Sequence, residues 1–267
     1  MSEPGLDALV DAARAYEGLF VGALFGQWPA QVLDAAGVGP GQSVLDVACG
    51  TGALARAATA RTGPTGHVAG VDPGPGMLAV ARELAPAVDW RQGVAEALPF
   101  ADRSFDAVGC QFGLMFFTDR PQALREMFRV LRPGGRLVVV TWDAVENIPA
   151  YEAEVALLDR LAGPQAASAL RAPFVLGDRD ELEDLVREAG GARVAVTTHR
   201  GTARFPSVRV MVEADLRGWL PLMGVALDEP TIDRVLGDAE HALRAYVARD
   251  GRAEFGVQAH FVTATKV

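Results

Sequence analysis

Hydrophobic and polar positions follow two different rhythms along the first half of the chain. Residues 6–36 carry apolar side chains at three- and four-residue steps, which predicts two helices interrupted at Gly26 and Pro29. Beyond a turn signal at residues 40–41, apolar runs typical of buried strands alternate with helical patterns. The predicted strands cover residues 43–48, 67–72, 88–92, 105–112 and 136–142, and the predicted helices cover 52–61, 75–84 and 119–131. This alternation predicts an α/β fold with a doubly wound sheet and right-handed crossovers.

The rhythm changes after residue 142. Helical patterns cover residues 150–161, 178–189 and most of 207–249, and strand patterns cover 193–205 and 255–266. If the last two strands pair in one sheet, the helices between them lie outside it. We interpret these helices as a cap over the active edge of the sheet, although a separate packing subdomain without ligand contact is the alternative. The expected division is N-terminal helices at 1–36, an α/β domain at 37–206 and 254–267, and a helical cap insertion at 207–253.

Composition narrows the class of protein. Half of the 267 residues are hydrophobic, the net charge is −9 and the isoelectric point is about 5.0. An acidic surface argues against nucleic acid as a partner. We expect no membrane span, because no uncharged apolar run approaches the ~20 residues that one needs, and no signal peptide, because the start of the chain is acidic. Cys49 and Cys110 lie in strand-like runs, which indicates reduced core thiols in a cytoplasmic protein without a metal centre.

The strongest chemical signal is the segment Asp46-Val47-Ala48-Cys49-Gly50-Thr51-Gly52. A buried strand ends there, a tight turn follows and a helix begins. Gly50 and Gly52 permit positive φ angles and a close approach of the backbone to a ligand. The free N–H groups at the start of the next helix suit a carboxylate or phosphate. Asp46 lies in an apolar strand, so its carboxylate needs partners, which a ligand ammonium or backbone donors of the loop would supply.

A second acidic residue, Asp72, ends the next predicted strand. At that place in a doubly wound sheet, a carboxylate can accept hydrogen bonds from both hydroxyls of a ribose. Asp72 could instead cap the turn at Pro73-Gly74. Its spacing from the glycine loop favours the role at the ribose.

Two further segments follow the third and fourth strands. In residues 93–100, Ala95 and Glu96 are in reach of an adenine edge, although Glu96 could equally be the acid at the start of a helix. Gln111 ends the fourth strand and is expected beside the ligand. The apolar residues after it, at 112–116, lie either near an acceptor or in the ordinary core.

These segments together resemble the class I methyltransferases that depend on S-adenosylmethionine (SAM). More narrowly, the chain resembles the subgroup that includes the ubiquinone/menaquinone-biosynthesis methyltransferases. The supporting stretches are Leu98-Pro99-Phe100, Ser104-Phe105-Asp106-Ala107-Val108 and Arg129-Val130-Leu131-Arg132-Pro133-Gly134-Gly135. The resemblance runs from about Leu33 to Asp143. It implies a Rossmann-like, seven-stranded sheet whose last strand is antiparallel.

The resemblance also implies roles for individual residues. The loop from Asp46 through Ala48 and Gly50 to Gly52 would hold the methionine end of SAM. The remaining implied roles are the ribose for Asp72, packing on adenine for Met77, the adenine edge for Ala95 and Glu96, and the sulfonium side for Gln111. Ala48 departs from the pattern, because many members carry glycine at this position, and its methyl group narrows the approach to the loop.

No catalytic residue is assigned, since SAM carries its own electrophile and a base is needed only if the acceptor must lose a proton. Asp143, at the rim after the fifth strand, is a candidate, whereas the histidines are interpreted as structural or surface groups: His199, His241 and His260. Tyr16, Phe20 and Trp28 either close over SAM or pack as ordinary helix residues. Apolar side chains of the cap suit a small hydrophobic or aromatic acceptor, or plain core packing: Met211, Leu216, Trp219, Leu220, Leu222 and Met223.

We therefore expect a SAM-dependent methyltransferase acting on a small molecule. Two alternative functions are considered. An NAD(P)-dependent oxidoreductase also uses a glycine turn and a later acid, but its third glycine is replaced here by Ala55. A SAM-binding protein without catalysis would carry the same loop. The sequence names neither the acceptor nor the attacking atom, and it leaves the oligomeric state, including a homodimer, open.

Overall fold

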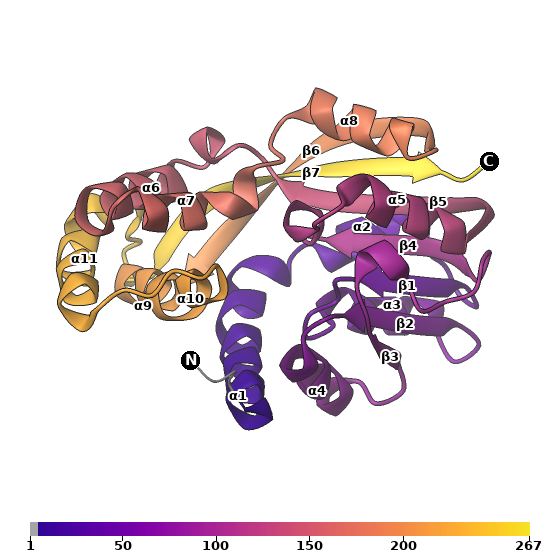
Figure 1. Cartoon of the computed structure of the whole chain (residues 1–267), viewed down its shortest axis with the longest axis horizontal. Coiled ribbons are helices and arrows are strands. Elements are labelled where there is room, and N and C mark those ends of the chain that lie inside the picture. Colours follow the sequence, from indigo (N-terminus) through magenta and orange to yellow (C-terminus); the bar gives the residue numbers. More distant parts are fainter. Residues whose placement is uncertain (1–4) are drawn as a thin grey trace. The chain divides into compact units, whose positions relative to one another are not determined.

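The computed structural model, which describes residues 5–267, contains a seven-stranded sheet in the order β3-β2-β1-β4-β5-β7-β6 (Figure 1). The strands are β1 Ser43–Val47, β2 His67–Asp72, β3 Asp89–Gln92, β4 Phe105–Gln111, β5 Leu131–Trp142, β6 Ala192–Phe205 and β7 Ala253–Thr265. The first five pair in parallel, and Leu45 of β1 lies opposite Ala69 of β2 and Val108 of β4. These three residues are fully buried, as expected for a parallel sheet covered on both faces.

The last strand, β7, runs against its neighbours. The amide of Asp143 donates to the carbonyl of Gln258, and the amide of Lys266 donates to the carbonyl of Gly135. The end of β7 thus lies beside the first half of β5, and the middle of β7 lies beside the end of β5, so the two strands are antiparallel. The Rossmann-like sheet with one antiparallel last strand is confirmed.

Helices flank the sheet on both sides. They include α1 Leu6–Tyr16, η1 Glu17–Phe25, α2 Pro29–Ala36, α3 Ala53–Thr62, α4 Pro75–Leu84, α5 Arg120–Val130 and α8 Arg179–Glu188. Local chemistry sets several ends: the side chain of Asp119 accepts the amide of Gln122 at the start of α5, and Asp178 caps α8 in the same way. In residues 5–267, no helix has the length and apolar character required to cross a bilayer.

The chain divides into two compact units. The first contains the residues up to Thr141 together with Asp178–His199 and His260–Val267, and the second contains Trp142–Gly177 and Arg200–Ala259. This division differs from the expected one, which placed 142–177 in the α/β domain and confined the insertion to 207–253. The difference arises because the helix that follows β5 packs against the later helices of the second unit. The role of residues 207–253 as a cap stays a prediction.

The second unit has a helical core of its own. Its helices are α6 Pro149–Ala162, α7 Pro164–Arg171, α9 Val208–Ala214, η6 Asp215–Trp219, α10 Leu220–Leu222 and α11 Glu229–Ala242, and α6 packs on both α7 and α11. Met211, Leu216 and Leu220 are buried in this core, which favours ordinary packing for them. Leu222 and Met223 are exposed. The apolar residues of the expected cap therefore divide into core and surface.

Three local features differ from the expected elements. Residues Glu17–Phe25 form a π-helix rather than a continuation of the α-helix before them. β5 begins at Leu131 and not at residue 136, since the backbone around Gly134 and Gly135 bonds to Lys266 of the antiparallel neighbour. The helix α7 was not expected, because its eight residues make little more than two turns, too few to show a helical repeat in the sequence.

Candidate functional site

The glycine loop after β1 is held in left-handed backbone conformations. Ala48, Gly50 and Gly52 have φ angles of 56°, 53° and 88°. A Cβ on Gly52 would lie 2.4 Å from Cη2 of Trp90, so only glycine fits there. Ala48 accepts a conformation that costs an L-residue about 1–2 kcal/mol.

Asp46 lies under this loop with 2% of its surface exposed. Its Oδ2 accepts a hydrogen bond of 2.9 Å from the amide of Ala55, in the first turn of α3. Burial raises the pKa of Asp46 to about 8, and the charge of Asp72 adds to the shift, whereas the Ala55 amide opposes it. Of the two partners expected for Asp46, the backbone donor is therefore present. In a dinucleotide-binding loop the third glycine would stand at Ala55, where this fold accommodates a buried methyl group.

Asp72 joins two loops at the ends of adjacent strands. Its Oδ2 accepts the amide of Gly50 and its Oδ1 accepts the amide of Gly74, each at 2.8 Å. Burial raises the pKa of this carboxyl, and the two amides oppose the shift. Asp72 thus does cap the turn at Pro73-Gly74, as the alternative interpretation held. A carboxylate has about four acceptor positions, so hydrogen bonds to a ribose are still available to it.

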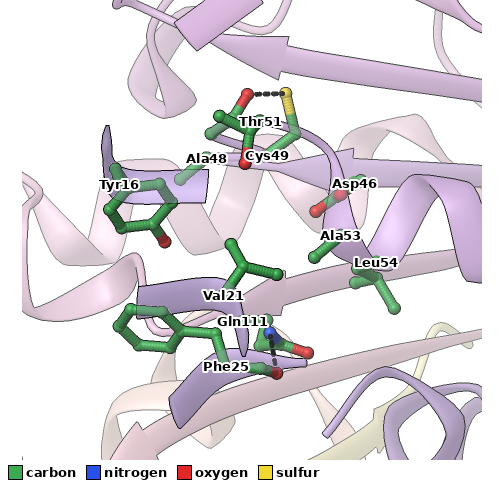
Figure 2. Close-up of a pocket in the computed structure, with 11 residues that line it drawn as sticks. Tyr16, Val21, Phe25, Asp46, Ala48, Cys49, Thr51, Ala53, Leu54 and Gln111 are labelled. Carbon is green, nitrogen blue, oxygen red and sulfur yellow. Dashed lines mark hydrogen bonds between the residues drawn. The ribbon is translucent and has the colours of Figure 1, made fainter. Parts of the chain in front are cut away.

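A pocket lies between the glycine loop and the N-terminal helices (Figure 2). It is lined by Tyr16, Val21, Phe25, Asp46, Ala48, Cys49, Gly50, Thr51, Ala53, Leu54 and Gln111. Four of the predicted site residues, Asp46, Ala48, Gly50 and Gln111, are brought together here. Gly52, two positions after Gly50, is the N-cap of α3.

Gln111 carries the pocket's unsatisfied polar atom. Its Nε2 donates to the carbonyl of Phe25 at 3.4 Å, whereas its buried Oε1 has no hydrogen-bond partner among residues 5–267. An unmade hydrogen bond of this kind costs about 1–3 kcal/mol. A ligand that presents an ammonium group to this pocket would satisfy the oxygen, so the pocket fits the amino-acid end of SAM.

Aromatic residues build the wall of the pocket opposite the loop. The Tyr16 ring stacks on Phe25 with centroids 5.7 Å apart, and Phe25 packs on Phe112 at 5.4 Å. Phe112 follows β4 with a φ of 58°, a strained conformation that turns the chain at the end of the strand. Burial and the nearby carboxylates Asp72, Glu17 and Asp46 raise the pKa of Tyr16. Its phenol therefore stays neutral and can donate a hydrogen bond.

The other aromatic residues of these helices pack differently. Trp28 is fully buried and its Nε1 donates to the carbonyl of Leu24, so it belongs to the core. Phe20 packs on Tyr16 with centroids 5.9 Å apart. Only Tyr16 of the three expected aromatic residues lines the pocket.

The residues predicted for the adenine lie outside the lining of the pocket. Met77, in the first turn of α4, is beside the Asp72 turn, because a Cβ on Gly74 would come within 3.3 Å of its Cγ. Ala95 is buried in the short helix η2 Ala95–Ala97. The Glu96 carboxylate accepts the amide of Thr118 at 2.9 Å, just before α5, so its side chain acts at a helix start. The adenine edge stays a prediction for these three residues.

His199, His260 and Asp143 have structural partners. His199 stacks on Phe261 with centroids 4.2 Å apart, and the buried His260 bonds Thr198. His241 is exposed on α11. Asp143, in the second unit, accepts from the amide of Ala144 and from Nδ2 of Asn147. Among residues 5–267, no group of acidic, histidine and cysteine side chains is arranged to hold a metal ion.

Sequence reasoning missed three polar residues around the loop. Glu17 accepts hydrogen bonds from Thr51 and Arg56, and Arg56 donates to the carbonyl of Thr51. Thr51 lay within the loop motif but had no predicted role. No pattern in the sequence marks Glu17 as a site residue, because its position depends on how the N-terminal helices cross the loop.

The chain is similar in sequence to known proteins. A ubiquinone/menaquinone biosynthesis C-methyltransferase of Hahella chejuensis is 45% identical over 126 residues, which are 45% of this chain and 51% of that protein. The chain thus spans about half the length of the first relatives. A protein of the same description from Laribacter hongkongensis is 38% identical over 192 residues, 66% of this chain and 78% of the relative.

Solved structures agree in fold. A candidate methyltransferase of antibiotic biosynthesis from Anabaena variabilis superposes with a TM-score of 0.66 at 20% identity, covering 90% of this chain and 96% of that one. The model of the ubiE/COQ5 methyltransferase family matches residues 22–161, more than half of the chain and all of the glycine loop and pocket strands. The chain is therefore a member of the ubiE/COQ5 methyltransferase family.

Proposed function

We propose that the protein transfers a methyl group from SAM to a small-molecule acceptor. The observation that supports this most is the pocket at the end of β1 and β4. It combines a left-handed glycine loop, the start of α3 and an acceptor oxygen on Gln111 that is unpaired among the described residues. Family membership points to the same chemistry.

The residues of the first unit would hold SAM along the ends of the strands. The free amides at the start of α3, a helix of ten residues, suit the carboxylate of the methionine end. Gln111 Oε1 would accept from the ammonium, and Asp72 would accept from the ribose hydroxyls. Met77, Ala95 and Glu96 are proposed for the adenine, with Glu96 contributing through its backbone, since its carboxylate is engaged at Thr118.

When bound, SAM supplies a methyl group activated by a sulfonium. The protein's own contribution is alignment and exclusion of water. Tyr16, Phe25 and Val21 provide an aromatic and apolar wall for this purpose. The neutral phenol of Tyr16 can orient a ligand by donating a hydrogen bond but is a poor general base. We assign no catalytic residue.

For the acceptor, we propose a small hydrophobic or aromatic molecule, and a ring carbon of a demethylated quinol is the first to test. The relatives from Hahella and Laribacter are C-methyltransferases of quinone biosynthesis, which favours this class. Residues 162–267 lie outside the family match and include α7, α9, η6, α10 and α11. The acceptor can therefore differ from that of the relatives.

The proposal is tested by methyl transfer from isotope-labelled SAM to a panel of reduced quinones, phenols and amines. We expect label in at least one acceptor and release of S-adenosylhomocysteine. Tight SAM binding with no turnover across a broad panel would favour the catalytically inactive alternative. Thermal stabilisation by NADH but not by S-adenosylhomocysteine would favour the oxidoreductase.

We further infer a cytoplasmic protein whose partner is the acceptor rather than nucleic acid. The acidic charge supports this inference. A homodimer stays a hypothesis, which light scattering tests directly.

A further inference from the structure

The glycine loop is bonded to the N-terminal helices through one carboxylate. Glu17 Oε2 accepts from Thr51 Oγ1 at 2.5 Å, and Glu17 Oε1 accepts from Arg56 Nη2 at 2.6 Å. Arg56 Nη1 also donates to the Thr51 carbonyl at 2.5 Å. The three residues form a closed ring of hydrogen bonds. About a quarter of the Glu17 and Arg56 side chains is exposed, so water weakens these bonds only in part.

This ring lies where the two walls of the pocket meet. Tyr16, next to Glu17, and Val21 and Phe25 further along η1 form one wall. Thr51 and its neighbours in the loop form the other, and Figure 2 shows Tyr16, Val21 and Phe25 lying across from Asp46, Ala53 and Leu54. A second bond across the pocket is the long one from Gln111 Nε2 to the Phe25 carbonyl, at 3.4 Å. The ring at Glu17 is therefore the stronger of these two polar links between the walls.

We propose that Glu17 is a positioning residue that holds the N-terminal helices against the glycine loop and thereby sets how fast SAM and its product exchange. The proposal rests on the proposed function, because it concerns the same pocket. A ligand that reaches Gln111 and Asp46 lies between the two walls. Exchange then requires the walls to part, and the bonds of Glu17 resist that motion.

The structure also explains how the walls can part without unfolding. Glu17 begins a nine-residue π-helix, a form that is rare and concentrated at functional sites. Gly18 and Gly22 leave open space around this segment, since a Cβ on either glycine would meet no other described part of the chain within 4 Å. By contrast, α1 is bonded elsewhere through Arg14 and Glu83 of α4, at 3.0 Å. Breaking the ring at Glu17 therefore removes a polar link between η1 and the loop, while α1 keeps its own anchor.

The test uses Glu17→Gln, which keeps the size of the side chain and removes the charge, with Glu83→Gln as the matched control. Glu83→Gln breaks an ion pair of α1 that does not touch the loop. Stopped-flow displacement measures the dissociation rate of S-adenosylhomocysteine, and calorimetry measures its affinity. We expect S-adenosylhomocysteine to dissociate roughly 10- to 150-fold faster from Glu17→Gln, from the usual worth of a hydrogen bond to a charged group, and Glu83→Gln to match the wild type.

Variants of Thr51 keep the proposal testable if Glu17→Gln folds poorly. Thr51→Val removes the hydroxyl donor and is expected to accelerate dissociation, whereas Thr51→Ser restores the donor and is expected to restore the rate. A purely structural role would lower the melting temperature of the free protein and leave the dissociation rate unchanged. That result, or equal acceleration in Glu83→Gln, overturns the proposal. If the wild type binds no S-adenosylhomocysteine, the proposed function fails instead, so the two failures are distinguishable.

Discussion

Replacing Asp72 with asparagine separates the two roles that this carboxyl has in the structure. The carboxylate accepts the amides of Gly50 and Gly74, and its remaining acceptor positions are proposed for the ribose of SAM. Asparagine has the same shape but only one acceptor oxygen. Its NH2 group must therefore face one of the two backbone N–H groups, and it cannot accept from a ribose hydroxyl on that side.

The magnitude follows from the bonds that are lost. A hydrogen bond to a charged group contributes about 1.5–3 kcal/mol. Loss of one such bond to the ribose therefore weakens binding of S-adenosylhomocysteine by roughly 10- to 150-fold, at about 1.4 kcal/mol for each factor of ten. Loss of the bond to Gly50 or Gly74 lowers the free energy of unfolding by a comparable amount.

Calorimetry of S-adenosylhomocysteine binding and urea unfolding of the free protein measure the two effects. Asp89→Asn is the control, because Asp89 starts the neighbouring strand and pairs with Arg91 at the surface. We expect both quantities to fall in Asp72→Asn and neither to change appreciably in Asp89→Asn. A folded Asp72→Asn protein with wild-type affinity would refute the role of Asp72 at the ribose.

Three further predictions follow from buried groups. Burial raises the pKa of Asp46 to about 8. At pH 7, a bound ligand ammonium that favours the ionised carboxylate should therefore make Asp46 release about one proton per ligand. Calorimetry in buffers of different ionisation enthalpy should show this release in the wild type and not in Asp46→Asn. Glu154 and Asp215 are buried together, and burial raises the pKa of both and that of Asp215 to about 7. Since an unfolded carboxyl titrates near pH 4, the contribution of this pair to the free energy of unfolding should be greatest below about pH 4 and be lost as the pH rises through about 7. Between pH 5 and 9, Glu154→Gln should therefore lose less stability than the wild type in urea unfolding as the pH rises; an equal slope in both proteins contradicts this. Gly52→Ala should lower the free energy of unfolding by about 2–5 kcal/mol, because alanine would be left-handed there and its Cβ would overlap Trp90. A loss below about 1 kcal/mol in urea unfolding would contradict the claim that only glycine fits at this position.

The sequence predicted the parallel half of the sheet from local pattern alone. The runs at 43–48, 67–72 and 105–112 are apolar and bounded by turn residues, and they match β1, β2 and β4 within one residue at each end. The glycine loop was predicted for a similar reason, since the spacing from Asp46 to Asp72 is set by one βα unit. The direction of β7 could not be predicted from local pattern, because that pattern indicates a strand but not its orientation. Only the family resemblance implied that β7 is antiparallel.

Contacts between distant segments were beyond prediction from the sequence. Glu17 bonds Thr51 across 34 positions, and only the packing of α1 and η1 over the loop brings them together. The grouping of α6 with α11 in the second unit likewise depends on tertiary packing, which the helical pattern does not encode. Glu96 shows the limit for a single side chain: both of its predicted roles suited the motif, and only the structure shows that its carboxylate accepts the Thr118 amide, while its role at the adenine edge stays a prediction.

The most direct test of the central claim is a crystal structure of the protein with S-adenosylhomocysteine. The account predicts the amino-acid end of the ligand at the start of α3, its ammonium within hydrogen-bond distance of Gln111 Oε1, and its ribose hydroxyls on Asp72. Ligand density at a different edge of the sheet, or a ribose turned away from Asp72, would contradict it.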